Sequence, residues 1–247
     1  QALDVRPHPH IGLSTVTYLF DGKITHRDSV GAIQTIRPGE VNWMTAGRGV
    51  THSERFEDLR REGGAMHGIQ AWVALPDGLE EIEPSFMHHP DSDLPTYEGG
   101  GMWARLIAGK GFGAEASVKT HSPMFYAHWK LDAGATAGLP AEYPERAAYV
   151  ADGQVEVDGR TWHAGQMLVF APGETVKVTA LTPASIMLLG GEPVGPRFVE
   201  WNFVSSSRDR IEQAKADWRA GRMKLPDADD QEFIPLPEPT PPANPMS

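Results

Sequence analysis

The chain has 247 residues, with 22 basic against 33 acidic side chains and a formal net charge of −11. This acidic balance disfavours direct binding to nucleic acids or anionic membranes, because both carry negative charge. The sequence has no cysteine, which excludes disulfides and thiolate metal ligands and fits a cytoplasmic protein, and it has no apolar run long enough to cross a membrane. Its 26 glycines and 21 prolines favour short strands joined by tight turns over long helices.

Two short stretches in the first quarter of the chain each place two candidate metal ligands two residues apart. They are residues 6–10, RPHPH, and residues 50–54, VTHSE. Side chains at positions i and i+2 leave the same face of an extended strand, so two neighbouring strands would bring all the ligands to one point. One such pair alone is often a solvated feature of a strand or turn, whereas two pairs favour a metal site. The candidates are His8, His10, His52 and Glu54.

The donor set formed by those side chains decides which metals it can hold. Imidazoles with one carboxylate suit iron, manganese, nickel, copper or zinc rather than calcium or magnesium. Such a set leaves coordination positions open, where a substrate or dioxygen can bind. A purely structural metal is disfavoured, because structural sites are usually closed tetrahedral shells dominated by sulfur.

The chain between the two stretches has the pattern of strands joined by tight turns. Residues 13–20 are rich in β-branched and aromatic side chains and end at the turn dipeptide Asp21-Gly22. A further strand is expected at residues 32–36, followed by a turn at 37–40. His26 lies on the expected return strand, where we predict a solvated or hydrogen-bonded side chain rather than a fifth ligand.

Three segments together closely resemble the pirin family within the cupin superfamily. They read HPHIGLSTVTYLFDG from His8, RPGEVNWMTAGRGVTHSE from Arg37 and HGIQAWVALP from His67. The resemblance implies an all-β fold of two tandem cupin barrels, also called double-stranded β-helices or jelly rolls, with the metal in the N-terminal barrel. It assigns the metal ligands to the two motifs, one position matching each: His8, His10, His52 and Glu54. Family members carry several dozen residues ahead of the first motif, so we expect an early strand to be missing from the N-terminal barrel.

The resemblance also implies an activity, that of a quercetin 2,3-dioxygenase-like oxidoreductase. The substrates would be a flavonol or related enediol-containing aromatic and O2. The cofactor would be one divalent transition metal, Fe(II) first, with zinc, manganese, nickel, cobalt or copper as alternatives. Glu54 would serve both as a ligand and as the catalytic acceptor of the substrate's proton. The alternative is a non-catalytic iron- or redox-sensing regulatory protein that binds a protein partner, with the C-terminal domain as the contact surface.

Several other side chains in the first half remain open to two interpretations. His67 either donates a proton from beside the site or caps the strand that follows it. The adjacent His88 and His89 would point to opposite faces of a strand, so we predict a surface loop there. Three apolar residues are candidates for either a pocket wall or the core: Phe20, Trp43 and Met44.

The second half repeats the spacing of strands and turn dipeptides seen in the first. We predict an N-terminal metal-binding domain at 1–118, a C-terminal cupin domain without metal ligands at 119–225, and a proline-rich extended tail at 226–247. No His-x-His or His-x-Glu motif occurs in the later strands, and His163 is isolated. One short C-terminal helix is expected, starting at Ser206 with a capping-box-like sequence and ending near Gly221.

Overall fold

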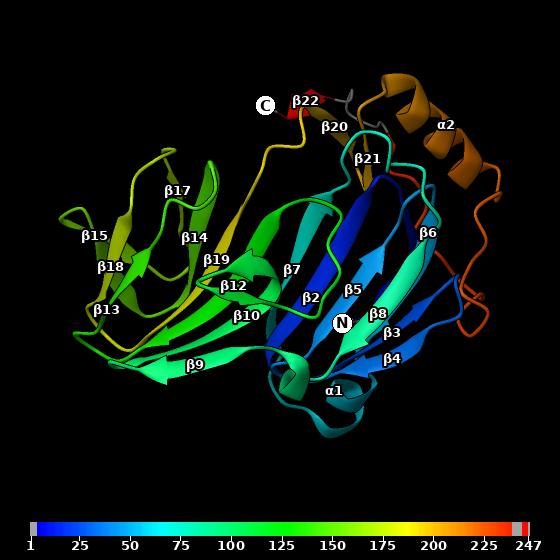
Figure 1. Cartoon of the computed structure of the whole chain (residues 1–247). Coiled ribbons are helices and arrows are strands. Elements are labelled where there is room, and N and C mark those ends of the chain that lie inside the picture. The colour runs from blue at the N-terminus through cyan, green and yellow to red at the C-terminus, as the bar shows by residue number, and fades with distance from the viewer. Residues whose placement is uncertain (1–3, 239–243, 247) are drawn as a thin grey trace. The chain divides into compact units, whose positions relative to one another are not determined.

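The computed structural model describes residues 4–238 and 244–246, and far more of these residues lie in strands than in helices (Figure 1). The chain forms two compact units. Unit 1 joins residues 1–91 with residues 194–247, and unit 2 is the continuous segment 92–193. The predicted domains, 1–118, 119–225 and 226–247, are consecutive segments. In the structure, the sequence of unit 2 is instead inserted between the two segments of unit 1. The strands within residues 96–115 pair inside unit 2, and the chain after residue 193 returns to unit 1.

Unit 1 is built on two four-stranded antiparallel sheets, ordered β1-β6-β3-β4 and β7-β2-β5-β8. Figure 1 shows β2, β5 and β8 running side by side in the second of these sheets. The strands and helix of this part are β1 Val5–His10, β2 Leu13–Asp21, β3 Ile24–Asp28, β4 Ile33–Ile36, β5 Val41–Thr45, β6 Val50–Arg55, α1 Glu57–Glu62, β7 His67–Ala74 and β8 Ser85–His89.

Burial in two strands of unit 1, β2 and β5, does not alternate from residue to residue. Every residue of β5 is buried, as are the first seven residues of β2. A strand covered on both faces can hold an uninterrupted run of β-branched and aromatic side chains. The turn predicted after β2 is confirmed: Gly22 has a φ of +84°, and its amide donates to the Asp21 side chain at 2.8 Å.

The chain completes unit 1 with a small sheet and one helix after residue 193. These elements are β20 Arg197–Glu200, β21 Phe203–Ser205, α2 Arg208–Arg219 and β22 Asn244–Met246. The helix buries the face formed by Ile211, Ala214 and Trp218, and these residues share an apolar cluster with Ile11 and Phe203. Burial of that stripe explains why a short helix is stable at this position.

The helix begins one residue later than its sequence pattern predicts. Ser207, not Ser206, is the N-cap, and its side chain accepts from the amide of Arg210. Ser206 is occupied elsewhere, because its amide and hydroxyl donate to the Glu80 carboxylate at 2.7 and 2.6 Å. The predicted stop is close, with Ala220 as the C-cap and Gly221 at a φ of +67°.

The start of the predicted proline-rich tail lies along unit 1. Between residues 226 and 238 the described chain has neither helix nor strand. Ile234 donates its amide to the carbonyl of Pro7 at 2.8 Å, and its carbonyl accepts from the indole of Trp218 at 3.0 Å. Residues 239–243 and 247 of the predicted tail lie outside the described residues, and 244–246 form the strand β22, which pairs with β20.

Unit 2 has its own two sheets and its own apolar core. The sheets run β11-β10-β12-β19-β14-β17, with β9 paired to β10, and β13-β18-β15-β16. Trp129, Leu139 and Val150 are among the fully buried members of the core. The elements are η1 Asp91–Asp93, β9 Thr96–Gly99, β10 Met102–Gly111, β11 Ala114–Glu115, β12 Met124–Leu131, β13 Thr136–Leu139, β14 Glu145–Asp152, β15 Gln154–Val157, β16 Arg160–His163, β17 Met167–Phe170, β18 Val176–Ala180 and β19 Ala184–Gly191.

The anchoring of α2 in unit 1 can be measured with two identical substitutions at sites of different burial. Ile211 is 0% exposed, whereas Ile33 is 62% exposed. We expect Ile211→Ala to lower the free energy of unfolding by about 2–5 kcal/mol, because it leaves a cavity under the helix. Ile33→Ala should cost less than about 1 kcal/mol, since no packed side chain is removed. Urea denaturation followed by circular dichroism compares the two, and equal losses would contradict the packing described for α2.

Candidate metal centre

Three of the predicted ligands meet in the structure. His8 and His10 lie on β1 and His52 lies on β6, and one ring nitrogen from each falls within 4.8 Å of the other two. All three side chains are buried. Antiparallel pairing sets His8 directly opposite His52, so the grouping follows from strand register. Among the residues that the structure describes, these histidines form the one group of this kind.

A bulge in β1 helps to aim these histidines. The register slips between Val5 and His8, where β1 has one more residue than β6 opposite it, and Pro7 lies within this segment. Proline has no amide hydrogen to donate to a ladder, so it fits a position where the pairing is interrupted. Bulges re-aim neighbouring side chains, and here the bulge immediately precedes the two ligand positions of β1.

Backbone carbonyls determine the tautomer of the two histidines on β1. Nδ1 of His8 lies 2.9 Å from the carbonyl oxygen of Arg6, and Nδ1 of His10 lies 3.2 Å from that of Asn202. A carbonyl only accepts, so each Nδ1 carries the hydrogen and donates it. The lone pair of each neutral ring is then on Nε2, the nitrogen left for a metal.

The spacing of the ring nitrogens fits a bound metal ion. Nε2 of His10 and Nε2 of His52 lie 3.1 Å apart. Two nitrogens that each lie 2.0–2.1 Å from one metal ion, with an N–metal–N angle of roughly 90°, would be about 3 Å apart. A cation between them would also remove the repulsion between two converging lone pairs. The donor set therefore suits a divalent transition metal, for which imidazole nitrogen is a common ligand.

Burial keeps the histidines in the neutral form that a metal needs. Burial lowers the pKa of His8, and it lowers the pKa of His10 and His52 well below the ordinary value of 6.5. The neighbouring histidines lower the pKa of His10 and His52 further, because one positive charge disfavours another nearby. At neutral pH these rings carry no proton that a metal would have to displace.

The structure does not bring Glu54 into the same group. Its carboxylate Oε1 instead accepts a hydrogen bond from Nε2 of Gln70 on β7 at 2.5 Å. Burial raises the pKa of the Glu54 carboxyl, while His26 and the hydrogen bond from Gln70 act in the opposite direction. Glu54 lies two residues beyond His52 on β6, as its motif predicts, but its role as a ligand stays a prediction.

His26 lies in the interior of unit 1. The residue is 5% exposed and its Nε2 lies 2.8 Å from Oδ2 of Asp28. Its Nδ1 lies 3.3 Å from Nδ1 of His52. Of the two states predicted together, solvated or hydrogen-bonded, the side chain adopts the hydrogen-bonded one. Sequence reasoning missed Asp28, although the i and i+2 spacing of His26 and Asp28 on one strand is the same signal that marks the ligand pairs.

The other candidates of the first half take structural positions. His88 and His89 lie on β8, paired with β5, so the predicted surface loop is wrong. The side chain of His88 is hydrogen-bonded to Oδ1 of Asn42 at 2.8 Å, which ties it to the sheet. His67 is exposed and packs its ring against Phe20 with centroids 4.8 Å apart. Trp43 and Met44 are buried core residues.

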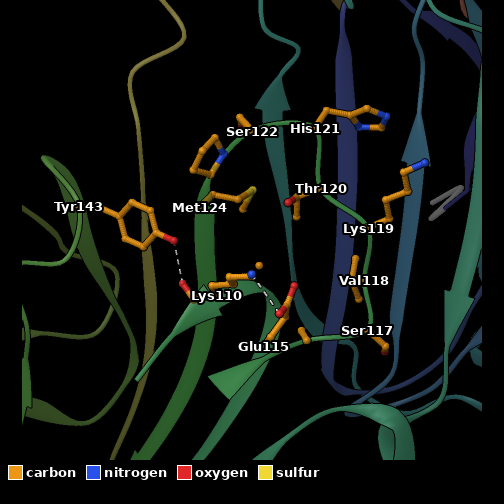
Figure 2. A pocket seen from close by; sticks show the side chains of 13 residues that line it. Lys110, Glu115, Ser117, Val118, Lys119, Thr120, His121, Ser122, Met124 and Tyr143 are labelled. Carbon is orange, nitrogen blue, oxygen red and sulfur yellow. Dashed lines mark hydrogen bonds and ion pairs between the residues drawn. The ribbon is translucent and has the colours of Figure 1, made fainter. Parts of the chain in front are cut away.

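Unit 2 contains a cavity of about 570 Å³ that is lined by a different kind of side chain. Figure 2 shows the hydroxyl of Tyr143 directed at Lys110, and it donates to the Lys110 carbonyl at 3.0 Å. The Lys110 ammonium pairs with Glu115 at 3.1 Å in the same view. His121 is the only histidine among the lining residues, so the cavity offers no cluster comparable to the triad in the described part of unit 2.

Comparison with known proteins decides the family. The family model for pirin matches residues 1–73, and the model for the pirin C-terminal cupin domain matches residues 126–224. The chain belongs to the pirin family. A pirin-like protein of Caulobacter vibrioides is 70% identical over 239 residues, which is 96% of this chain and 83% of the relative. The predicted fold, all-β with tandem cupin barrels and a short C-terminal helix, is confirmed.

Solved structures of similar proteins share this fold. A crystal structure of quercetin 2,3-dioxygenase from Acinetobacter baumannii is 32% identical, with a TM-score of 0.86 over 98% of this chain and 82% of that one. A bacterial pirin from Escherichia coli, in complex with nickel(II), has a TM-score of 0.63 over 78% of this chain and 79% of that one. At 22% identity, this second likeness concerns the fold alone. In the described part of the chain, no helix has the length and apolar character to span a membrane.

The neutral histidines make the stability of the metal-free protein depend on pH. In the unfolded chain each histidine takes up a proton near pH 6.5, whereas in the folded chain the lowered pKa of His10 and His52 prevents it. Stability is therefore present above pH 6.5 and is lost as the pH falls below it, by up to about 1.4 kcal/mol per histidine per pH unit.

We expect His10→Gln to reduce this loss by about 1 kcal/mol between pH 6.5 and 5.5, because one of the histidines has been removed. Urea denaturation in the presence of a chelator, at several pH values, measures the slope. His163→Gln is the matched control, since His163 is exposed on β16 of unit 2. A slope that stays unchanged in His10→Gln would contradict the neutral state inferred for this ring.

Proposed function

We propose that this pirin is a metal-dependent dioxygenase that cleaves a flavonol of the quercetin type, or a related enediol-containing aromatic, with O2. The observation that carries the proposal is the buried triad, in which the nitrogens of His10 and His52 converge at 3.1 Å. The likeness to the Acinetobacter baumannii quercetin 2,3-dioxygenase over nearly the whole chain supports the reaction class. The lack of cysteine fits work in a reducing compartment, the cytoplasm.

We propose the triad as the ligands of one divalent transition metal, with Glu54 as the fourth ligand. Fe(II) is the first candidate, and zinc, manganese, nickel, cobalt and copper are the alternatives. Neutral imidazoles suit this whole group of metals. When bound, the metal would supply Lewis acidity and open coordination positions for small ligands.

Glu54 is also the proposed acceptor of the substrate's hydroxyl proton. Burial raises the pKa of this carboxyl and so makes it a better base than an exposed carboxylate. Gln70 donates to Oε1 and thereby orients the carboxylate, so Oε2 is the proposed acceptor atom. The roles of ligand and base compete for the same oxygens, and a substrate that displaces Glu54 from the metal would free it to take the proton.

Trp72 on β7 is the proposed wall for the aromatic substrate, in place of Trp43 and Met44, which are core residues. Its ring meets that of His10 edge to face, with centroids 5.3 Å apart, and it is 42% exposed. An exposed indole beside a buried polar site offers a flat apolar surface against which an aromatic ring can stack. Gln70, two residues earlier on the same strand, links this wall to Glu54.

The proposal is tested by anaerobic reconstitution with Fe(II), followed by addition of quercetin and air. We expect oxygen uptake together with loss of the flavonol absorption. His52→Ala should abolish both metal binding and uptake, because it removes a ligand that no neighbour replaces. His163→Ala, at an exposed position in unit 2, is the matched control. Tight iron binding by the wild type without any uptake would contradict the oxygenase and favour the iron- or redox-sensing alternative.

The two roles of Glu54 can be separated by a conservative variant. Glu54→Gln keeps the size and the contact with Gln70 but removes the negative charge and the basicity. We expect the rate constant of turnover to fall by about 10²–10⁴-fold if this residue is the base. Metal titration of the same variant measures the ligand role independently. Full activity in Glu54→Gln would show that the proton goes elsewhere.

A further inference from the structure

A chain of three side chains leads from the interior of unit 1 to the triad. Oδ2 of Asp28 lies 2.8 Å from Nε2 of His26, and Nδ1 of His26 lies 3.3 Å from Nδ1 of His52. The other ring nitrogen of His52, Nε2, is the atom that faces His10. The chain follows from sheet geometry, because β3 pairs with β6 and sets Asp28 opposite His52.

Asp28 and His26, the two residues of this series farthest from the triad, are held rigidly. Oδ1 of Asp28 accepts hydrogen bonds from the backbone amides of Val30 and Ala32 at 3.1 and 2.9 Å. The residue is 2% exposed. The ring of His26 stacks on Phe86, with centroids 4.4 Å apart and an interplanar angle of 18°. Both groups can therefore keep one orientation without help from solvent.

With a neutral His26 ring, the order of donors and acceptors along Asp28, His26 and His52 has one solution. The Asp28 carboxylate accepts, so Nε2 of His26 carries the hydrogen and donates it to Asp28. Nδ1 of His26 then has a lone pair and accepts, so Nδ1 of His52 is the donor. The lone pair of His52 is left on Nε2, where the proposed metal would bind.

We propose that Asp28 and His26 are positioning residues that set the tautomer of His52 and thereby the metal affinity of the centre. This inference rests on the metal-binding role proposed for the triad. Nδ1 of His8 and Nδ1 of His10 each donate to a backbone carbonyl. A backbone carbonyl remains in place whatever side chain its residue carries. The partner of His52 is a side chain, so only this ligand has a tautomer that depends on the identity of two further residues.

Asp28→Asn tests the direction of the hydrogen bonds along Asp28, His26 and His52, with almost no change in the shape of the side chain. The backbone amides of Val30 and Ala32 need an acceptor, so the amide oxygen of the new side chain would face them. Its NH2 group would then face Nε2 of His26, which has to accept. The hydrogen moves to Nδ1 of His26, Nδ1 of His52 becomes the acceptor, and Nε2 of His52 carries a hydrogen that blocks the metal.

We expect the affinity for Co(II), measured by competition with a coloured chelator, to fall by about 10–100-fold in Asp28→Asn. The visible absorption bands of bound Co(II) should change as well. If Asp28→Asn only unfolded part of the protein, the molecules that still bind Co(II) would keep the wild-type bands. In a His26→Leu background, Asp28→Asn should have no further effect, because its route to His52 is gone. His128→Leu, at a buried histidine of unit 2, is the matched control for replacing a buried imidazole.

A second measurement tests the inference without any variant. Nuclear magnetic resonance of the metal-free wild type, labelled with ¹⁵N in its histidines, should show hydrogen on Nε2 of His26 and on Nδ1 of His52. The opposite tautomers would overturn the proposal, as would an unchanged Co(II) affinity in Asp28→Asn or losses that multiply in the double variant. A wild type that binds no Co(II) would overturn the metal centre and this proposal together. Metal binding without oxygen uptake would overturn only the oxygenase.

Discussion

The antiparallel pairing of β1 with β6 is the constraint on which the rest of the site depends. It sets His8 opposite His52, while the neighbouring pairing of β3 with β6 sets Asp28 opposite the same histidine. β6 is therefore the central strand of the site, with ligands on one side and their support on the other. A slip of one residue would turn these side chains to the other face of the sheet, so the register and the chemistry cannot vary independently.

The interior of unit 1 buries four imidazole rings. His8, His10, His26 and His52 are all nearly inaccessible to solvent. A buried imidazole is tolerated only when its N–H has an acceptor, and each of these rings has a carbonyl, a carboxylate or another ring beside it. The same contacts that satisfy the rings also leave their lone pairs converging, so stability and metal binding have one physical origin.

The sequence predicts the ligand motifs, the all-β architecture and the helix because each is a local pattern. It does not predict that the helix starts at Ser207, because Ser206 is held by Glu80, which is 126 positions away in the chain. It does not single out Asp28 either, since a His-x-Asp pair on a strand resembles an ordinary surface pair until its neighbours are known. Its ligand motifs give no sign that the Glu54 carboxylate turns to Gln70, a partner on another strand.

The carbonyl that accepts the hydrogen bond of His10 belongs to Asn202, 192 positions further along the chain. The whole of unit 2 lies between these two residues in the sequence, so they are synthesised at different times. Residues 1–91 leave the ribosome before the segment that completes their own unit. All of unit 2 is translated and can fold while unit 1 still lacks its last sheet and helix. One acceptor of the triad is then missing until the segment after residue 193 has been made. The complete centre can consequently assemble only after the whole of unit 2 has been translated.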